Sequence, residues 1–289
     1  MKELVVISGK GGTGKTSLVA AFASLAGNMV LCDADVDAAD LHLIMDPHIV
    51  ERADFQGGHS AVIIKEKCTE CGICRDLCKW DAIDESFSVN AIECEGCGVC
   101  FYFCPEKAIE FLQKTCGEWF ISDTRFGPMV HARLGIAEEN SGKLVTLVRQ
   151  EARKLAEQKG YPLILTDGPP GVGCPVIASI GGATAVLIVA EPTVSGKHDM
   201  IRVAQLAQHF RVPAMLCMNK FDLNPGETRI IEDLAKEKTV TVLGRIPFDP
   251  VFTKSMVEGK NIFEFSSSTE AGTCIKQIWD KISAIFETG

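Results

Sequence analysis

The sequence lacks any run of about 18 consecutive apolar residues, although 46% of its 289 residues are hydrophobic, so it predicts no membrane-spanning helix. It also lacks a basic leader with an apolar core and a cleavage site, and a strand-like run, Leu4–Ile7, follows Met1 almost directly. Excess positive charge is missing too: the net charge of −9 argues against broad binding to nucleic acid or acidic membranes. We therefore expect a cytoplasmic protein that has no nucleic-acid partner and does not bind membranes.

Cysteine, by contrast, is abundant: there are 13, and eight of them fall between Cys68 and Cys104. An unexported protein is not expected to build a disulfide framework, so metal ligation is the better explanation. The segment contains the spacing C-x2-C-x2-C-x3-C twice, in Cys68–Ile83 and again 26 residues later in Cys94–Ile109. It is therefore an internal duplication.

This spacing places three thiolates around one loop and sends the fourth to a second cluster. The arrangement resembles bacterial two-cluster ferredoxins, with one departure: Lys79 stands where that pattern has Pro, whereas Pro105 keeps it. Zinc knuckles or free structural thiols are the alternative, but eight Cys in two identical four-ligand registers exceed what zinc spacing produces. We expect two [4Fe-4S] clusters, which serve electron transfer because no iron is left open for a substrate. The expected ligands are Cys68, Cys71, Cys74 and Cys104 for one cluster, and Cys94, Cys97, Cys100 and Cys78 for the other.

Outside this segment, short β-branched runs alternate with longer helical patterns, as in a mostly parallel sheet covered by helices. Composition changes at a Gly-containing linker, residues 54–60, and the alternation resumes by about Lys143. The sequence therefore predicts an α/β domain, residues 1–57 and 114–289, with a small α+β ferredoxin-like domain inserted at residues 58–113. The expected strands are Leu4–Ile7, Met29–Cys32, Leu163–Thr166, Ala185–Val189 and Ala214–Met218, and the expected helices are 15–26, 142–159, 197–210 and 226–237.

A phosphate-binding loop follows the first expected strand. Residues 9–16 match G-x-x-x-x-G-K-[ST] between an apolar strand and the start of a helix, which is the context that this motif requires. Backbone N–H groups would hold the phosphates, Lys15 would neutralise the β and γ phosphates, and the Thr16 hydroxyl would bind Mg²⁺. We expect ATP and Mg²⁺ as cofactors of this P-loop NTPase, with ATP held by Gly9, Lys10, Gly11, Gly12, Thr13, Gly14, Lys15, Thr16 and Ser17.

An additional lysine, Lys10, gives the loop the sequence KGGTGKT, which resembles the deviant Walker A motif of the MinD/ParA family. That family includes the nitrogenase iron protein, and the resemblance spans essentially all of the chain outside the insert. In the family the early lysine reaches the nucleotide of a second subunit, so the resemblance implies an ATP-dependent homodimer. The alternative role for Lys10 is that of a solvent-exposed loop lysine.

Further positions resemble the family at strand ends. Asp35 resembles the switch I residue that orients the attacking water and the Mg²⁺ shell, and Asp167 resembles the Walker B carboxylate near Mg²⁺. Asn219 and Pro247 resemble residues on the adenine side. Each alone could be an ordinary turn after a strand, but their order along the chain is specific. The resemblance implies Lys10, Lys15, Asp35 and Asp167 as catalytic residues, and Thr16, Asp35 and Asp167 as Mg²⁺ ligands.

Together the motifs suggest an ATP-hydrolysing iron–sulfur protein in which a nucleotide-driven dimer rearrangement is coupled to electron transfer with a redox protein. The insert begins shortly after Asp35, and the nitrogenase iron protein, which this chain resembles, couples ATP to electron donation. An iron–sulfur cluster assembly or carrier ATPase is one alternative, although the Cys pair that such proteins have near the C terminus is absent. A positioning ATPase with redox-sensing clusters is another.

Three further features leave alternatives open. Cys174 lies seven residues after Asp167, where the nitrogenase iron protein has a ligand of its dimer-bridging cluster, but this chain lacks the second Cys of that site. Residues 127–131 and 138–143 could form a partner surface or ordinary loops. One face of residues 275–286 is apolar, and the polar side mixes acidic and basic residues. These mixed charges favour packing of the helix on the core over membrane binding.

Overall fold

The computed structural model describes residues 1–135, 141–266 and 268–288. The chain divides into two compact units. The insert expected at residues 58–113 lies within the longer segment of the second unit. No helix in the described residues is long and apolar enough to cross a bilayer. The first unit comprises Met1–Arg52, Trp119–Arg133 and Ser141–Gly289, and the second comprises Ala53–Glu118 and Leu134–Asn140.

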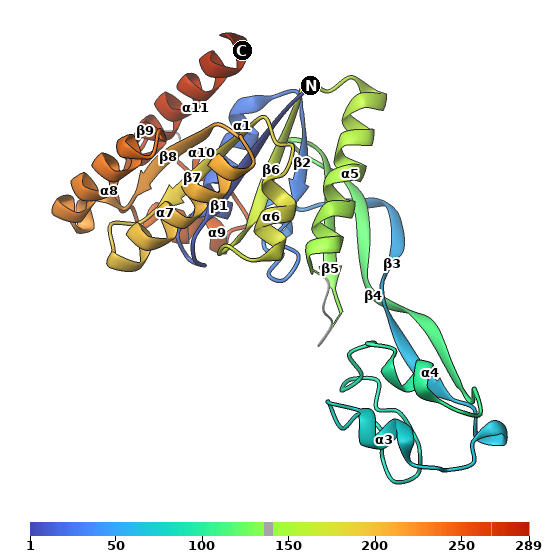
Figure 1. Ribbon diagram of the computed structural model, residues 1–289. Coiled ribbons are helices and arrows are strands. Elements are labelled where there is room, and N and C mark those ends of the chain that lie inside the picture. The colour runs from blue at the N-terminus through green and yellow to red at the C-terminus, as the bar shows by residue number, and fades with distance from the viewer. Residues whose placement is uncertain (136–140, 267, 289) are drawn as a thin grey trace. The chain divides into compact units, whose positions relative to one another are not determined.

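In the described residues, nine strands form one sheet in the order β3-β4-β5-β2-β6-β1-β7-β8-β9 (Figure 1). They are β1 (Lys2–Ser8), β2 (Met29–Asp33), β3 (His48–Ile63), β4 (Ile109–Thr124), β5 (Gly127–Leu134), β6 (Leu163–Pro170), β7 (Ala185–Ala190), β8 (Ala214–Asn219) and β9 (Thr241–Ile246). Parallel pairs join β1 to β6 and β7, β2 to β5 and β6, and β8 to β7 and β9. All five apolar runs expected as strands are strands, which confirms the mostly parallel α/β fold.

Helices pack against both faces of the central strands, and alternate residues of β1 supply the two faces. Leu4 and Val6 join an apolar cluster with α1, α2, α10 and α11, whereas Val5 and Ile7 join another with α6, α7 and α8. The four expected helices correspond to α1, α5, α7 and α8, with ends displaced by three residues at most. The helices of the first unit are α1 (Lys15–Ala26), α2 (Leu41–Met45), α5 (Ser141–Lys159), α6 (Cys174–Ile180), α7 (Val194–His209), α8 (Pro225–Glu237), α9 (Val251–Val257), α10 (Ile262–Phe265) and α11 (Glu270–Thr288).

The C-terminal helix α11 packs on the core, as its mixed charges predicted. Ile275, Ile278 and Ile282 are buried, and the ring of Trp279 lies 5.0 Å from that of Phe22 on α1, measured between centroids. Most of the apolar face of α11 is therefore covered by protein, whereas Ile285 is 40% exposed.

Residues 127–131 form the first part of β5 instead of a loop, so the expectation of an ordinary loop there is wrong. Met129 and Val130 are buried and pair with β2. The sequence alone predicts no strand in this segment. Of the segment 138–143, residues 138–140 lie outside the described residues, and the remainder begins α5.

The second unit has a short helix at the equivalent place in each repeat. α3 (Ile73–Leu77) follows Gly72, and α4 (Val99–Phe103) follows Gly98, 26 residues later. Both glycines have positive φ, 83° and 74°, a conformation that L side chains rarely adopt. The duplication therefore extends from sequence to backbone geometry.

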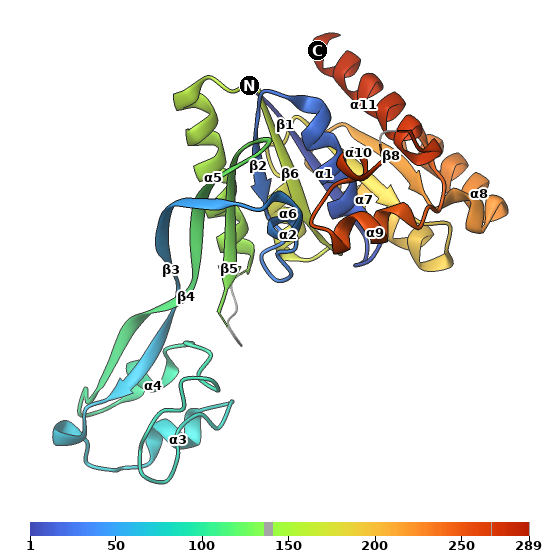
Figure 2. The ribbon, with the colours of Figure 1, turned by 180° about the vertical axis from the view of Figure 1, so that it is seen from behind.

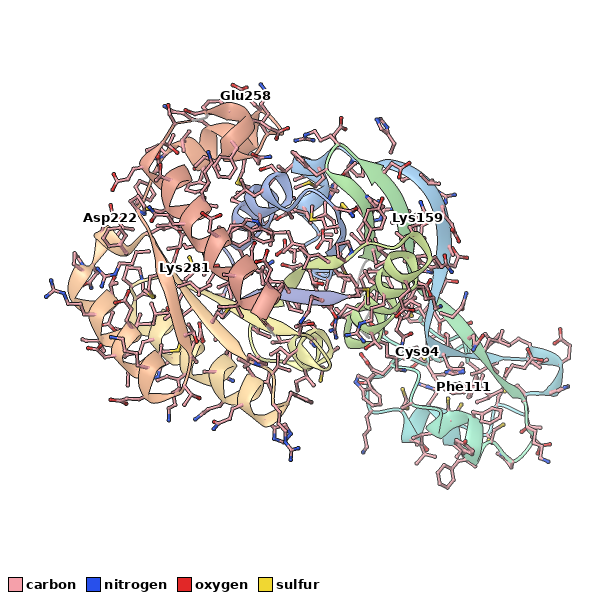
Figure 3. All side chains as sticks on the ribbon, turned by 90° about the horizontal axis from the view of Figure 1, so that it is seen from above. Cys94, Phe111, Lys159, Asp222, Glu258 and Lys281 are labelled. Carbon is pink, nitrogen blue, oxygen red and sulfur yellow. The ribbon has the colours of Figure 1, made fainter. Side chains whose placement is uncertain are left out.

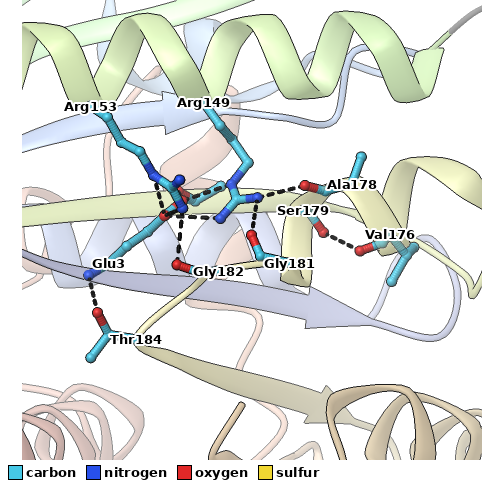
Figure 4. Close-up of polar contacts among 10 residues, drawn as sticks. Glu3, Arg149, Arg153, Val176, Ala178, Ser179, Gly181, Gly182 and Thr184 are labelled. Atoms are coloured by element: carbon cyan, nitrogen blue, oxygen red, sulfur yellow. Dashed lines mark hydrogen bonds and ion pairs between the residues drawn. The ribbon is translucent and has the colours of Figure 1, made fainter. Parts of the chain in front are cut away.

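A buried ion network fixes α5 beside β1 (Figure 4). Glu3 on β1 is 3% exposed and accepts hydrogen bonds from Arg149 at 2.8 and 2.9 Å and from Arg153 at 2.6 and 3.1 Å. The remaining Arg149 nitrogen donates to the carbonyls of Ala178 and Gly181, at 2.5 and 2.9 Å. Buried charges persist only with such partners, so the network fixes α5 and α6 relative to the strand that leads into the phosphate-binding loop.

Candidate functional site

The phosphate-binding loop connects β1 to α1. Gly14 has φ 88°, and a Cβ there would lie 2.4 Å from Nδ2 of Asn219, so glycine is required. That nitrogen, at the end of β8, donates to the carbonyl of Thr13 at 2.7 Å. Around Gly11 and Gly12, no described atom lies within 4 Å of an added Cβ. Asn219 therefore supports the loop from one side and leaves the other open to a ligand.

A cavity of about 330 Å³ lies over this loop, a size that suits a small-molecule ligand. Ten of the residues expected to bind a nucleotide or Mg²⁺ line it. Of the others, Gly9 and Lys10 line an adjacent recess, and Asp167 contacts Lys15. The ten are Gly11, Gly12, Thr13, Gly14, Lys15, Thr16, Ser17, Asp35, Asn219 and Pro247.

Apolar side chains line the end of the cavity near Pro247. Phe252 and Met256 come from α9, and Phe248 comes from the turn before it. The backbone N–H of Phe248 donates to Oδ1 of Asp222 at 2.7 Å, which fixes this turn. An aromatic and apolar surface suits a nucleobase. The motif around Pro247 pointed to this location, whereas α9 contains no motif that could have revealed its two residues.

Lys15 is buried among carboxylates. Its Nζ atom lies 2.5 Å from Oδ1 of Asp167 and 3.3 Å from Oδ2 of Asp35. Burial alone would lower the pKa of Lys15, but the charges of Asp167 and Asp35 outweigh it and raise that pKa. Burial raises the pKa of Asp35 to about 6, against the opposing charge of Lys15. Burial and the charge of Asp167 raise the pKa of Asp33 well above its usual value. The site thus holds more carboxylate groups than the single positive charge of Lys15 can neutralise.

Three buried polar atoms beside Lys15 have no hydrogen-bond partner within the described part of the chain. They are Oγ1 of Thr13, Oδ2 of Asp33 and Oδ1 of Asp35. Carboxylate, hydroxyl and phosphate oxygens are the ligands that Mg²⁺ prefers, and Thr16 lies on the wall of the same cavity. The residues present therefore fit a Mg²⁺ ion bound together with a nucleotide. Asp33 was not predicted, although it stands two residues before Asp35.

Glu191, which follows β7, binds two lysines of the site. It accepts from Lys10 at 3.0 Å and from Lys220, and Lys220 also donates to the carbonyl of Gly12 at 3.0 Å. Burial would raise the pKa of Glu191, but the hydrogen bonds from Lys220 and Lys10 outweigh it and lower that pKa. Lys10 is therefore held within its own subunit. The sequence predicted neither Glu191 nor Lys220, and only the adjacent Asn219 could have pointed to the latter.

Eight of the nine Cys of the second unit line two pockets. No disulfide forms among the 13 Cys of the chain, all of which the structure describes. Within the described residues, no three His, Cys, Asp or Glu side chains converge as the ligands of a single metal ion would. Cys68, Cys71, Cys74 and Cys104 line one pocket, and Cys94, Cys97, Cys100 and Cys78 line the other.

Backbone and aromatic groups complete these pockets. The N–H of Ala108 donates to Sγ of Cys104 at 3.3 Å, a type of hydrogen bond that tunes the potential of a cluster. Phe111 lines the other pocket together with Cys94 (Figure 3), and its ring stacks on His59 with centroids 4.8 Å apart. One pocket therefore has a backbone donor aimed at a cysteine sulfur, and the other has an aromatic wall.

Cys174 lies exposed at the first residue of α6. A Cβ added to Gly142 of α5 would lie 3.4 Å from its Cβ, so the two helix starts are adjacent. The structure describes one chain, so a bridging role for Cys174 stays a prediction that the iron content of a dimer would test.

The sequence matches the CobQ/CobB/MinD/ParA nucleotide binding domain over residues 4–262. The chain belongs to this family. It is a MinD/ParA-like nucleotide-binding ATPase.

Two relatives and one solved structure extend the comparison. The chain is 30% identical to an uncharacterised protein of Methanocaldococcus jannaschii, over 97% of this chain and 96% of that protein. Over 46 residues, it is 39% identical to the pyruvate synthase subunit PorD of Methanothermobacter marburgensis, which is 16% of this chain and 57% of that subunit. The septum site-determining protein MinD of Pyrococcus horikoshii, solved with Mg-ADP, gives a TM-score of 0.59 at 17% identity, over 97% of this chain and 95% of that one. At this identity the last likeness shows the fold alone.

Proposed function

We propose that this ATPase carries two [4Fe-4S] clusters, and that a nucleotide-driven rearrangement of its homodimer is coupled to electron transfer through them. The observation that carries the proposal is the presence in one chain of a nucleotide cavity and two four-cysteine pockets. Residues 58–113 would form the ferredoxin-like domain, and residues 1–57 and 114–289 the ATPase domain. The partial likeness to the pyruvate synthase subunit PorD supports the cluster half of the proposal.

At the nucleotide site, the loop N–H groups would bind the phosphates while Lys15 exchanges its carboxylate partners for phosphate oxygens. Asp35 and Asp167, released from Lys15, would then hold Mg²⁺ together with Thr16 and orient the attacking water. The unpaired Oδ1 of Asp35 supports this assignment. Bound Mg²⁺ would neutralise the charge that develops on the phosphoryl oxygens. Asn219 and Pro247 would hold the adenine.

In the dimer, Lys10 would leave Glu191 and reach the nucleotide of the partner subunit. The side chain of Lys10 is 38% exposed, so its ion pair with Glu191 is of the kind that contributes little to stability. An exchange of this partner for a phosphate therefore costs little, which supports a role for Lys10 in trans.

At the clusters, cysteine thiolates would fill all four positions on each, so the clusters would supply one-electron transfer and bind no substrate. Cys71 and Cys97 are exposed, one in each pocket. Exposed ligands of this kind support electron exchange with a separate donor or acceptor protein.

The test uses the protein purified without oxygen and with its clusters intact. The reduction potential of the clusters and the rate of electron delivery to a small-molecule acceptor are measured with and without Mg-ATP. We expect Mg-ATP to change at least one of them in the wild type and neither in Lys10→Ala, which retains the P-loop but loses the contact in trans. If Mg-ATP changes neither in the wild type, the coupling is ruled out.

The same preparation separates two alternatives. An iron–sulfur assembly or carrier ATPase would pass its clusters to an apo-acceptor, whereas an electron carrier keeps its iron through repeated redox cycles. A positioning ATPase with redox-sensing clusters would change its rate of ATP hydrolysis with the oxidation state of the clusters, without delivering electrons.

A further inference from the structure

Arg125 lies in the turn between β4 and β5 and binds three acceptors of the first unit. Its guanidinium donates to both carboxylate oxygens of Glu264 on α10, at 2.5 and 2.9 Å. It also donates to the carbonyl of Ile44 at 2.6 Å and to that of Gly259 at 3.1 Å. The ring of Phe126 lies under it, 4.9 Å from the guanidinium carbon. One side chain thus joins three separate segments of the first unit.

Figure 2 labels α2, α9 and α10, the elements in or next to which these segments lie. Two of the segments adjoin residues that line the cavity over the phosphate-binding loop. Ile44 belongs to α2, which begins directly after Asp40, and Asp40 lines the cavity. Gly259 closely follows α9, whose Met256 lines the cavity from the nucleobase end. Arg125 therefore contacts α2 and the residue two positions beyond the end of α9.

Arg125 is also connected through the chain to β4, the strand that ends directly before it. β4 begins at Ile109, closely after the cluster ligand expected at Cys104, and its residues belong first to the second unit and from Trp119 to the first. β4 is therefore the covalent return from the cysteine repeats to the ATPase. Its last residue, Thr124, is adjacent to Arg125.

The hydrogen bonds of Arg125 depend on the positions of the groups that accept them. The carbonyl of Ile44 is in the last turn of α2, where no helical N–H is available to it. Glu264 is itself oriented by the backbone N–H of Asn261 at 2.9 Å. A guanidinium binds a carboxylate and two carbonyls at fixed angles, which a lysine ammonium does not reproduce. Burial would raise the pKa of Glu264, but the hydrogen bond from Arg125 outweighs it and lowers that pKa.

We propose that Arg125 is a positioning residue that couples the nucleotide cavity to β4, so that closure of α2 and α9 around a nucleotide orders the strand leading from the cysteine pockets. The use of this coupling in electron transfer rests on the proposed function, whereas the experiment below tests the coupling itself. The coupling adds a non-covalent connection to the covalent one through β4, because the turn that follows β4 contacts both α2 and the segment that follows α9.

The test is hydrogen exchange of the full-length protein, as purified without oxygen, with and without a non-hydrolysable Mg-ATP analogue. In the wild type, we expect the analogue to slow exchange about fivefold or more in peptides from residues 109–124, as well as in the P-loop and α2. In Arg125→Gln, the P-loop should still respond and residues 109–124 should not. Arg125→Lys, which keeps the charge but loses the fork, should behave like Arg125→Gln. Arg229→Gln, at an exposed position of α8, is the control and should behave as the wild type.

If the role of Arg125 is purely structural, Arg125→Gln would accelerate exchange equally with and without the analogue. The nucleotide-dependent difference in residues 109–124 would then stay intact. That result, or the lack of any such difference in the wild type, would overturn the proposal. The iron content and the unfolding transition of each variant establish that it is folded. If Arg125→Gln abolishes the difference while Mg-ATP fails to change the clusters of the wild type, the mechanical link stands and the proposed electron coupling falls.

Discussion

His131 on β5 is a buried titratable residue that belongs to neither the nucleotide site nor the cysteine pockets. Its ring packs on Phe120, and its Nε2 atom shares a hydrogen bond of 2.9 Å with the hydroxyl of Ser122. Burial, with a further contribution from His42, lowers the pKa of His131 from 6.5 to about 4. The imidazole therefore stays neutral in the folded protein at pH values where the unfolded chain already binds a proton.

We expect this histidine to reduce the stability of the protein as the pH falls from about 6.5 to about 4, because only the unfolded chain gains a proton over that range. Above about pH 6.5, His131 causes no such loss, and by about pH 4 up to about 3 kcal/mol of unfolding free energy is lost. His131→Gln, whose amide can still bond Ser122, should lose less stability on acidification than the wild type. Urea unfolding followed by circular dichroism at about pH 5 and about pH 7.5 measures this difference. His48→Gln, at an exposed position, is the control, and an equal loss in His131→Gln and wild type would contradict the prediction.

Single residues were predictable where a motif fixes them locally. Gly14 is required by its own φ and by one neighbour, and Lys15 by its place at the start of α1, so spacing alone located both. Glu191 has no fixed distance in sequence from the loop whose lysine it binds. It reaches Lys10 because β7 pairs with β1, and the order of strands in a sheet is not written in any single segment.

At the level of elements, the repeats built around α3 and α4 make the crossed ligand assignment testable. If Cys104 completes the pocket of Cys68, the double variant Cys68→Ala and Cys104→Ala damages one cluster and leaves about four iron atoms per chain. Cys68→Ala combined with Cys78→Ala should instead damage both clusters and leave almost none. Iron analysis with electron paramagnetic resonance of the reduced proteins distinguishes the two. The opposite pattern would mean that each repeat holds its own cluster.

The long strands β3 and β4 were not predicted, and the reason is tertiary pairing. The linker expected at residues 54–60 lies within β3, although its glycines disfavour a strand. At Gly57, a Cβ would lie 2.5 Å from the ring of Phe55 and 3.1 Å from Cβ of Cys116, so glycine allows a close approach inside the strand. A glycine that permits packing and a glycine that ends an element look alike in sequence, and only the neighbouring β4 tells them apart.

For the whole molecule, the structure of one subunit describes a state in which Lys10 is paired with its own Glu191 at 3.0 Å. The family resemblance implies that Lys10 acts on the nucleotide of a second subunit. Both cannot hold at once, so assembly of an ATP-bound dimer would require this ion pair to break. In a dimer of this kind, Glu191 would compete with the partner subunit for the same lysine.

Glu191→Gln removes the charge that holds Lys10 and should therefore favour the ATP-dependent dimer. A partly exposed ion pair contributes about 1 kcal/mol or less, so we expect the dimer dissociation constant in Mg-ATP to fall by up to about fivefold. Sedimentation velocity over a range of protein concentrations measures it, with Lys10→Ala as the variant that should not dimerise in ATP. Because Glu191 also binds Lys220, ATP affinity is measured in parallel to show that the loop is intact. A Glu191→Gln protein that binds ATP normally but dimerises less than the wild type would mean that Glu191 presents Lys10 to the partner instead of withholding it.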